Sequence, residues 1–509
     1  MATETTARHA PGPTPATPPP PLLTPAGEPV TVVHLSSEFS PFARTGGLGE
    51  AVSGLAAFQA RHGVRTVAMV PLYLQARQLA GELVPVGDAF TIRVGWRTEA
   101  VRLFRQARPE PGAEVYFIDH PASFDRPGIY GDAHGDFSDN ARRFACFTLA
   151  ALAAIPQLVS GPALIHAHDW HTGLVPVYLR TTHTWDHFYD KVPVVFAIHN
   201  AGYQGIFPPS ELAEIGIPFE LFDWRYLEWH GRISFLKAGA TFADQVVTVS
   251  PTHANELRTP EGGFGLHELF LHLGDRLSGI TNGIDPAAWD PATDPALPAH
   301  YSTEDLSGKA RCKAALQRAF GLPQRQRVPL LLMTGRLVTQ KGIDLVLRCH
   351  DLFRADVQFI FLGRGEPQFE KALKGLAAAL PNQIGLQLDW SEQMEHRLIA
   401  GGDILLMPSW YEPCGLTQMR AQRYGTVPVV RRIGGLADTV DDEVTGFLFD
   451  PYTPAALAWA VGRALTAYED QPRWQRMQWT GMTRDFSWGR SALEYFALYR
   501  RALAMRHTG

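Results

Sequence analysis

The chain has 509 residues, of which 45% are hydrophobic and 19% charged, and its formal net charge is −5. That length exceeds what one hydrophobic core supports, so we expect at least two domains. The acidic balance argues against a nucleic-acid-binding protein, whose surface would be basic. No apolar run approaches the length of a membrane-spanning helix, and the composition is that of an ordinary globular enzyme.

The first 29 residues contain nine prolines, no serine and two acidic residues, Glu4 and Glu28. We interpret residues 1–29 as a disordered tail, because they lack the apolar core of a signal peptide and the acid-poor, serine-rich character of a transit peptide. The four cysteines of the chain are scattered without a CxxC pair. This pattern favours a reducing, cytoplasmic setting over a disulfide framework or a zinc site.

The first half of the chain alternates apolar runs with helical patterns. An apolar run at Thr31–Ser36 is followed by helical spacing over Leu48–His62, which stops at Gly63, a common helix end. Strands alternating with helices predict a doubly wound α/β domain over residues 30–284. Its further strands are expected at Arg65–Val70, Glu114–Ile118, Ala163–Ala167, Val192–Ile198 and Gln245–Val249.

A Pro/Asp-rich stretch, Asp285–Pro298, is interpreted as a linker, and the alternation restarts after it. We expect a second doubly wound domain over residues 285–486 and a final helix at about Ser487–Arg506, within a last segment of residues 487–509. Strands of the second domain are expected at Val328–Thr334, Val357–Leu362, Asp403–Met407 and Val427–Val430.

Two cations follow the strand predicted at Val328–Thr334. Arg336 and Lys341 lie after its carboxyl end and before the helical pattern of Ile343–Leu352. Ligands of open α/β sheets bind outside the carboxyl ends of the strands. An Arg fork and a Lys point charge there are suited to a diphosphate, whereas two solvated surface cations are the alternative.

A lone carboxylate, Glu412, lies in the loop after the strand that ends at Met407, and a helical pattern begins at Gly415, Leu416 and Thr417. The free N–H groups of a helix start attract anions. A carboxylate beside them suits sugar hydroxyls, so the segment indicates a nucleotide sugar. The alternative is an ordinary βαβ turn with a surface Glu.

Together these segments resemble the signature blocks of bacterial glycogen synthases and plant starch synthases. The resemblance runs in order from about residue 31 to the C-terminus. Its blocks are Arg336 with Lys341, Glu412–Thr417, Thr45–Gly49, His166–His171, His199-Asn200 with Tyr203–Gly205, and Thr281–Asp285.

The resemblance implies a GT-B fold, in which two Rossmann-like domains face each other across a cleft and a C-terminal helix returns to the first domain. It implies transfer of an α-glucosyl unit from ADP-glucose to the non-reducing 4-hydroxyl of an α-1,4-glucan, with retention of configuration and without a cofactor or metal. ADP-glucose and UDP-glucose are not distinguished. The rival functions are another retaining glycosyltransferase of this fold, of the sucrose or trehalose type, and a non-catalytic glucan-binding protein.

The resemblance implies that Arg336 and Lys341 bind the departing diphosphate and that Glu412 binds the sugar hydroxyls. It places Asp169, His199 and Asn200 at the glucosyl unit. Two assignments keep alternatives. Asn282 either lines the donor site or forms a turn, and Trp390 either stacks on the base or packs in the core.

Two positions depart from related sequences. Arg44 precedes Gly46 and Gly47 where most glycogen synthases have Lys, and we expect it to contact the donor phosphates. The alternative is a relaxed position and low activity. Arg420 occupies the position where many relatives of this fold have a second acidic residue. His166, His168 and His171 do not predict a zinc site, because no fourth ligand is apparent.

Overall fold

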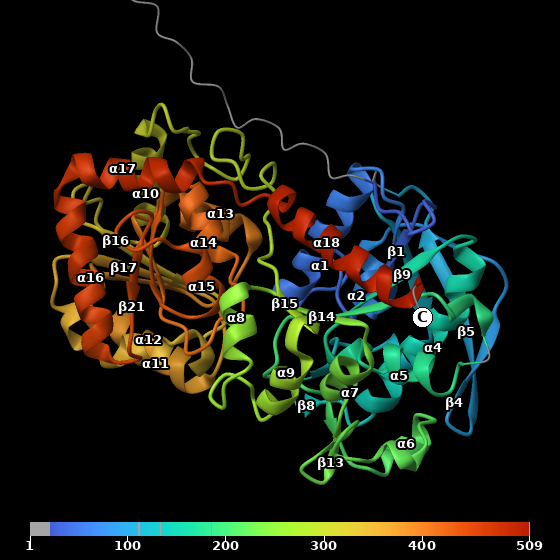
Figure 1. Cartoon of the computed structure of the whole chain (residues 1–509). Helices are drawn as coiled ribbons and strands as arrows, with labels where there is room; N and C mark the ends of the chain where they lie inside the picture. Colours follow the sequence, from blue (N-terminus) through green and yellow to red (C-terminus); the bar gives the residue numbers. More distant parts are fainter. Residues whose placement is uncertain (1–20, 110–111, 133, 185, 508–509) are drawn as a thin grey trace, which may run out of the picture.

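The computed structural model describes residues 21–109, 112–132, 134–184 and 186–507. It forms two lobes, each built on a sheet with helices on both faces, as Figure 1 shows. This is the predicted α/β architecture of two doubly wound domains. Within the described ranges, no helix is long and apolar enough to cross a membrane.

The first lobe is built on a ten-stranded sheet that is parallel from β15 to β6 and antiparallel beyond. Its order is β15 (Leu277–Gly279), β14 (Gln245–Thr248), β10 (Val194–Ile198), β9 (Ala163–His168), β1 (Thr31–Leu35), β2 (Thr66–Pro71), β6 (Glu114–Asp119), β5 (Arg97–Gln106) and β3 (Leu83–Pro85), with β4 (Phe90–Val94) paired to β5. The predicted strands are thus confirmed to within two residues. The antiparallel strands β3, β4 and β5 were not predicted, although β5 alternates between exposed and buried residues.

The second lobe has a six-stranded parallel sheet. Its order is β18 (Ile384–Gln387), β17 (Gln358–Leu362), β16 (Leu330–Thr334), β19 (Ile404–Met407), β20 (Val427–Arg431) and β21 (Phe447–Phe449). Its central strands are buried throughout, which is why they read as continuous apolar runs. In both sheets the strand order reverses beside a central strand, at β1/β9 and at β16/β19. Such switch points open a crevice at the carboxyl ends of the strands.

Helices cover both sheets. In the first lobe they are α1 (Gly47–Arg61), α2 (Leu74–Leu79), α3 (Pro121–Phe124), α4 (Asn140–Leu158), α5 (Leu174–Arg180), α6 (Glu211–Glu214), α7 (Phe235–Phe242), α8 (Pro251–Glu256) and α9 (His267–Leu273). In the second they are α10 (Ser307–Ala319), α11 (Ile343–Arg348), α12 (Pro367–Ala379), α13 (Glu392–Gly401), α14 (Thr417–Arg423), α15 (Gly434–Thr439), α16 (Pro454–Glu469) and α17 (Gln471–Thr483).

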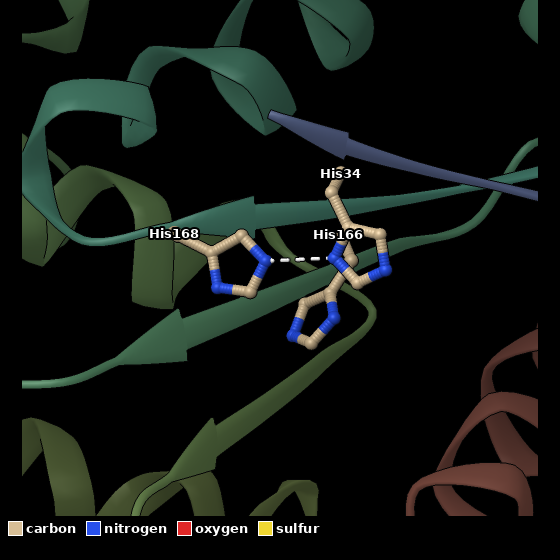
Figure 2. Close-up of side chains that lie close together, drawn as sticks. All are labelled: His34, His166 and His168. Carbon is tan, nitrogen blue, oxygen red and sulfur yellow. Dashed lines mark hydrogen bonds between the residues drawn. The ribbon is translucent and has the colours of Figure 1, made fainter. Parts of the chain in front are cut away.

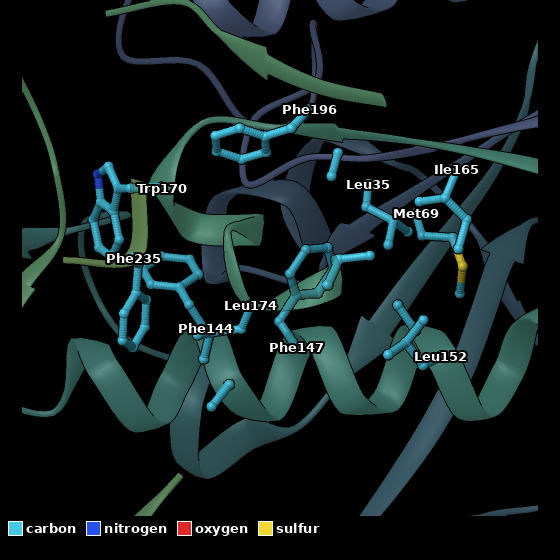
Figure 3. Packing of buried hydrophobic residues seen from close by; sticks show 14 of the residues in the cluster. Leu35, Met69, Phe144, Phe147, Leu152, Ile165, Trp170, Leu174, Phe196 and Phe235 are labelled. Carbon is cyan, nitrogen blue, oxygen red and sulfur yellow. The ribbon is translucent and has the colours of Figure 1, made fainter. Parts of the chain in front are cut away.

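The core of the first lobe lies between α4 and the central strands. Phe144, Phe147 and Leu152 of α4 face Leu35 and Ile165 of the sheet, as Figure 3 shows. All five side chains are buried. A helix fixed in this way holds β1 and β9 rigidly, and the loops after these strands carry candidate site residues.

The last helix, α18 (Trp488–His507), returns to the first lobe and packs on α1, as seen at the red end of the chain in Figure 1. The two crossings between the lobes lie side by side, because the Ile284 N–H donates to the Phe486 carbonyl at 2.8 Å. Gly283 permits this approach, since a Cβ there would lie 2.6 Å from the Trp488 nitrogen. Adjacent crossings form a natural hinge.

Two expectations need correction. Residues 21–29 of the predicted tail form a turn in which Val30 N–H donates to the Leu22 carbonyl at 3.1 Å, and Leu22 is buried against the first sheet. Residues 1–20 lie outside the described residues. The predicted linker Asp285–Pro298 is packed as well, because Trp289 is buried and stacks on His396 with ring centroids 3.8 Å apart.

Candidate active site

Arg336 lies in the loop after β16, beside the switch point of the second sheet. One Nη of its guanidinium donates to the Tyr203 hydroxyl, and the other to Gln340 Oε1, both at 3.3 Å. Tyr203 belongs to the first lobe and is half exposed. The contact therefore brings a cation of the second lobe onto the face of the first.

Glu412 is buried in the loop after β19 and forms an ion pair with Lys341, whose Nζ lies 2.6 Å from Oε2. The Ser409 hydroxyl donates to the same oxygen at 3.1 Å. The structure thus joins two segments that are 71 residues apart in sequence. The ion pair and the Ser409 hydrogen bond give Glu412 a defined orientation. An ordinary surface Glu, the alternative interpretation, would not be held in this way.

The loop of Glu412 is held from behind by the turn that opens α15. The Gly435 N–H donates to the Glu412 carbonyl at 3.1 Å. Gly434 has a φ of 40°, and a Cβ there would lie 2.0 Å from the same carbonyl oxygen. Only glycine allows this approach. The sequence gives no sign of this packing against Glu412.

The predicted anion cradle begins where expected, since Leu416 caps α14 and Thr417 opens it. Gly415 has a φ of 72°, in the left-handed region that favours glycine. The helix has seven residues. Binding of an anion by this segment stays a prediction.

Asp169 of the first lobe adopts a rare backbone conformation directly after β9. Its φ is 57°, unusual for a residue other than glycine. One carboxylate oxygen, Oδ1, accepts the backbone N–H of His199 at 2.7 Å and that of Asn200 at 3.4 Å. Burial raises the pKa of Asp169 to about 7. Strain of this kind concentrates at functional sites.

Tyr411, next to Glu412, reaches the first lobe. Its side chain hydrogen bonds Asn200. Gly202 makes room for it, because a Cβ there would lie 2.7 Å from the Tyr411 hydroxyl oxygen. Tyr203 and Tyr411 are therefore candidate site residues that the sequence reasoning missed; Tyr203 stands inside a recognised block, which was a usable signal.

Asn282 is buried, as expected for a residue at the boundary of the lobes, and its Oδ1 accepts no hydrogen bond from the described residues. Cys414 lies nearby and hydrogen bonds the Asn282 backbone, while burial raises the pKa of its thiol to about 12. A thiol held in this protonated state is no nucleophile.

Arg44 and Trp390 meet at another part of the boundary. The Arg44 guanidinium lies 5.0 Å from the centroid of the Trp390 ring and pairs with Glu50 at 2.6 Å. Trp390 is 41% exposed, so its interpretation as a core residue is wrong. A Cβ at Gly46 or Gly47 would meet nothing within 4 Å. Packing does not require these glycines, and the first turn of α1 is left open.

Three of the histidines gather behind His199. His34, His166 and His168 are fully buried, and one ligand nitrogen of each lies within 4.8 Å of the others, as Figure 2 shows. His171, which the sequence groups with them, instead stacks on Tyr130 with centroids 4.5 Å apart. The sequence did not single out His34.

Comparison with known proteins accounts for this arrangement. A family model described as "Starch synthase catalytic domain" matches residues 31–272, and one described as "Glycosyl transferases group 1" matches residues 318–477. A glycogen synthase from Anaeromyxobacter sp. (strain Fw109-5) is 45% identical over 480 residues, which cover 93% of this chain and 99% of that protein. The chain belongs to the glycogen synthase family.

Other relatives agree. A glycogen synthase from Myxococcus xanthus is 42% identical over 93% of this chain and all of its own length. The catalytic domain of starch synthase IV from Arabidopsis thaliana, bound to ADP and acarbose, superimposes with a TM-score of 0.84 at 33% identity over 93% of this chain and 99% of that one. A sucrose-phosphate synthase from Thermosynechococcus elongatus, at 19% identity and a TM-score of 0.59, shares the fold. The enzyme is a glycosyltransferase with the GT-B fold.

Proposed function

We propose that this enzyme transfers an α-glucosyl unit from ADP-glucose to the non-reducing 4-hydroxyl of an α-1,4-glucan, with retention of configuration, in the cytoplasm. One observation carries the proposal: Arg336 contacts Tyr203 across the lobes while Lys341 pairs with Glu412 at the switch point of the second sheet. The ADP in the similar starch synthase supports an adenine nucleotide as the donor's leaving group.

The two lobes bind different substrates. Residues 285–486 hold the nucleotide sugar, residues 30–284 hold the acceptor and the glucosyl unit, and the last helix, α18, returns to the first lobe. The base stacks on Trp390, whose ring is exposed and contacts Arg44. The open first turn of α1 at Gly46 and Gly47 leaves room for the donor.

Arg336 and Lys341 stabilise the negative charge that develops on the departing diphosphate. The backbone N–H groups of Gly415, Leu416 and Thr417 add neutral donors. Because Lys341 also pairs with Glu412, the same cation links the phosphate to the carboxylate that holds the sugar hydroxyls. Loss of Lys341 therefore affects both the leaving group and the glucosyl unit.

On the other side of the sugar, Asp169 orders the backbone of His199 and Asn200, and Asn282 offers an amide oxygen to which no described residue donates. The bond from the anomeric carbon to the phosphate oxygen breaks while the acceptor 4-oxygen bonds to that carbon from the same face. The acceptor proton passes to the departing phosphate oxygen, so no protein nucleophile is required.

The proposal is tested with the purified enzyme, a glycogen primer and either ADP-glucose or UDP-glucose, following nucleotide release. We expect faster turnover with ADP-glucose. A preference for UDP-glucose would contradict the proposed donor, and release of neither nucleotide would contradict glucosyl transfer.

Three variants test the proposed roles. Arg336→Ala, Lys341→Ala and Glu412→Ala should each lower kcat about a hundredfold or more, because each removes an interaction that strengthens in the transition state. Arg354→Ala is the matched control, since Arg354 is 79% exposed and, among the described residues, pairs only with Asp351. Near-normal turnover of Arg336→Ala or Lys341→Ala would exclude the diphosphate role, and a pure KM effect of Glu412→Ala would exclude a role beside the reacting carbon.

A further inference from the structure

A row of buried hydrogen bonds leads from the candidate site into the first lobe. His199 Nε2 lies 3.0 Å from His168 Nδ1, and His168 Nε2 lies 3.0 Å from His34 Nδ1. His34 Nε2 lies 2.8 Å from Gln59 Oε1 on α1. Figure 2 shows the His34–His168 step. Of these four residues only His199 is partly exposed.

The row continues beyond Gln59 into the last helix. The Gln59 amide nitrogen donates to the Tyr499 hydroxyl oxygen at 2.9 Å, and that hydroxyl lies 2.9 Å from His166 Nδ1. Because the hydroxyl accepts from the amide, its own proton points to His166 Nδ1. Tyr499 is fully buried on α18, and the amide oxygen of Gln59 faces the other way, toward His34.

The amide end that faces His34 decides the direction of every other bond in the row. An amide oxygen only accepts, so His34 carries its proton on Nε2 and accepts at Nδ1. His168 must then donate from Nε2 and accept at Nδ1, and His199 must donate from Nε2. This chain of reasoning holds for neutral imidazoles. Burial supports that state, because it lowers the pKa of His34 to about 4 and that of His199 to about 3.

We propose that Gln59 is a positioning residue that fixes the Nε2–H form of His199 through His34 and His168, so that His199 presents Nδ1 as a hydrogen-bond acceptor. No described residue donates to that atom. The inference rests on the proposed function, in which His199 contacts the glucosyl unit. An acceptor there suits a sugar hydroxyl, whereas the other tautomer would present an N–H.

Metal binding by His34, His166 and His168 is a poorer account of the cluster. Both ring nitrogens of His34 and both of His168 already take part in hydrogen bonds. A metal ion would have to break the His34–His168 bond, and only His166 Nε2 is left without a partner among the described residues. The ring nitrogens that a metal would need are already engaged in the row of hydrogen bonds.

The first test reads the tautomers directly. Ring-nitrogen NMR of the enzyme labelled with ¹⁵N-histidine distinguishes protonated from unprotonated nitrogens, and a His199→Gln spectrum assigns His199. We expect protonated Nε2 and bare Nδ1 at His199 in the wild type. A proton on Nδ1 would mean that the Gln59 amide faces the other way, and it would overturn the proposal. This readout needs no substrate, so it stands apart from any failure of the proposed function.

Kinetics of three variants give the second test. Gln59→Met removes the acceptor for His34 and should lower kcat about tenfold or more with little change in the KM for the donor. Gln59→Glu keeps an acceptor oxygen and should restore most of kcat. Tyr499→Phe is the control for lost stability, because it leaves the His34–Gln59 bond in place, and it should lower kcat by less than about threefold.

Two results would overturn the role of Gln59. One is a Gln59→Met enzyme with the kcat and the His199 tautomer of the wild type. The other is an equal loss of kcat in Gln59→Met and Tyr499→Phe with unchanged tautomers, which would mean that packing alone matters. If a Gln59→Met enzyme does not fold, the spectrum of the wild type remains the deciding test, because a proton on His199 Nδ1 would overturn the proposal without any variant.

Discussion

Arg420 joins the two lobes at a position where many relatives of the fold have a second acidic residue. It pairs with Glu50 of α1, and its second Nη lies 3.6 Å from Glu395 of α13. Its guanidinium carbon lies 4.2 Å from the centroid of the Trp289 ring. The side chain is only 9% exposed, so these contacts are shielded from water. Arg420→Met keeps the length of the stem and removes the charge.

We expect Arg420→Met to lower the free energy of unfolding by about 2 to 4 kcal/mol. Removing one partner of a buried ion pair costs about 3 to 5 kcal/mol. Two details of the site lower that figure: Glu50 keeps its 2.6 Å pair with Arg44, and Glu50 is 22% exposed. The lost cation–π contact adds about 0.5 to 2 kcal/mol.

The loss of stability in Arg420→Met should depend on pH. Burial raises the pKa of Glu395, and Arg420 lowers it, as do Arg44 and His396, while Glu50 raises it. The folded protein therefore takes up a proton on Glu395 at a higher pH than the unfolded chain, and that proton stabilises the fold as pH falls. Without Arg420 the pKa of Glu395 rises further. The destabilisation should be largest at about pH 8 and smaller at about pH 5.5.

Urea unfolding, followed by tryptophan fluorescence and far-ultraviolet circular dichroism at both pH values, measures this effect. Arg420→Lys keeps the charge but not the planar fork, so its free energy of unfolding should fall by about half as much as that of Arg420→Met. The reasoning would be refuted by an Arg420→Met protein that unfolds within about 0.5 kcal/mol of the wild type. A loss of the same size at both pH values would refute the part played by Glu395.

Two further predictions concern the boundary between the lobes. Arg44→Ala should raise the KM for the nucleotide sugar and lower kcat/KM about tenfold or more, while Arg44→Lys retains substantial activity; an Arg44→Ala enzyme like the wild type would mean that Arg44 is no donor ligand. Because Arg336 and Tyr203 come from different lobes, we expect the site to assemble only when the lobes close. Small-angle scattering should therefore show a smaller radius of gyration with ADP and a maltooligosaccharide, and unchanged scattering at saturation would indicate a permanently closed cleft.

The two α/β lobes, and the strand ends at which the candidate site residues lie, could be predicted from the sequence. Strands of a parallel sheet are buried on both faces, so they appear as continuous apolar runs that end where Arg336, Asp169 and His199 begin. The motifs around these residues are local as well. Their recognition therefore required no knowledge of how distant segments pack. Strands such as β5, which have one exposed face, were not predicted because their apolar residues only alternate.

The side-chain contacts of these residues depend on how distant segments pack, and they could not be predicted from the sequence. Glu50 and Arg420 are 370 positions apart, and Gln59 and Tyr499 are 440 apart. Neither pair belongs to a local pattern, since a polar residue on a helix gives no sign of the face that it will meet. Sequence reasoning likewise grouped His171 with His166 and His168, whereas the fold substituted His34 from the neighbouring strand. Strand register, which is set by packing of the whole sheet, brings His34 and His166 side by side.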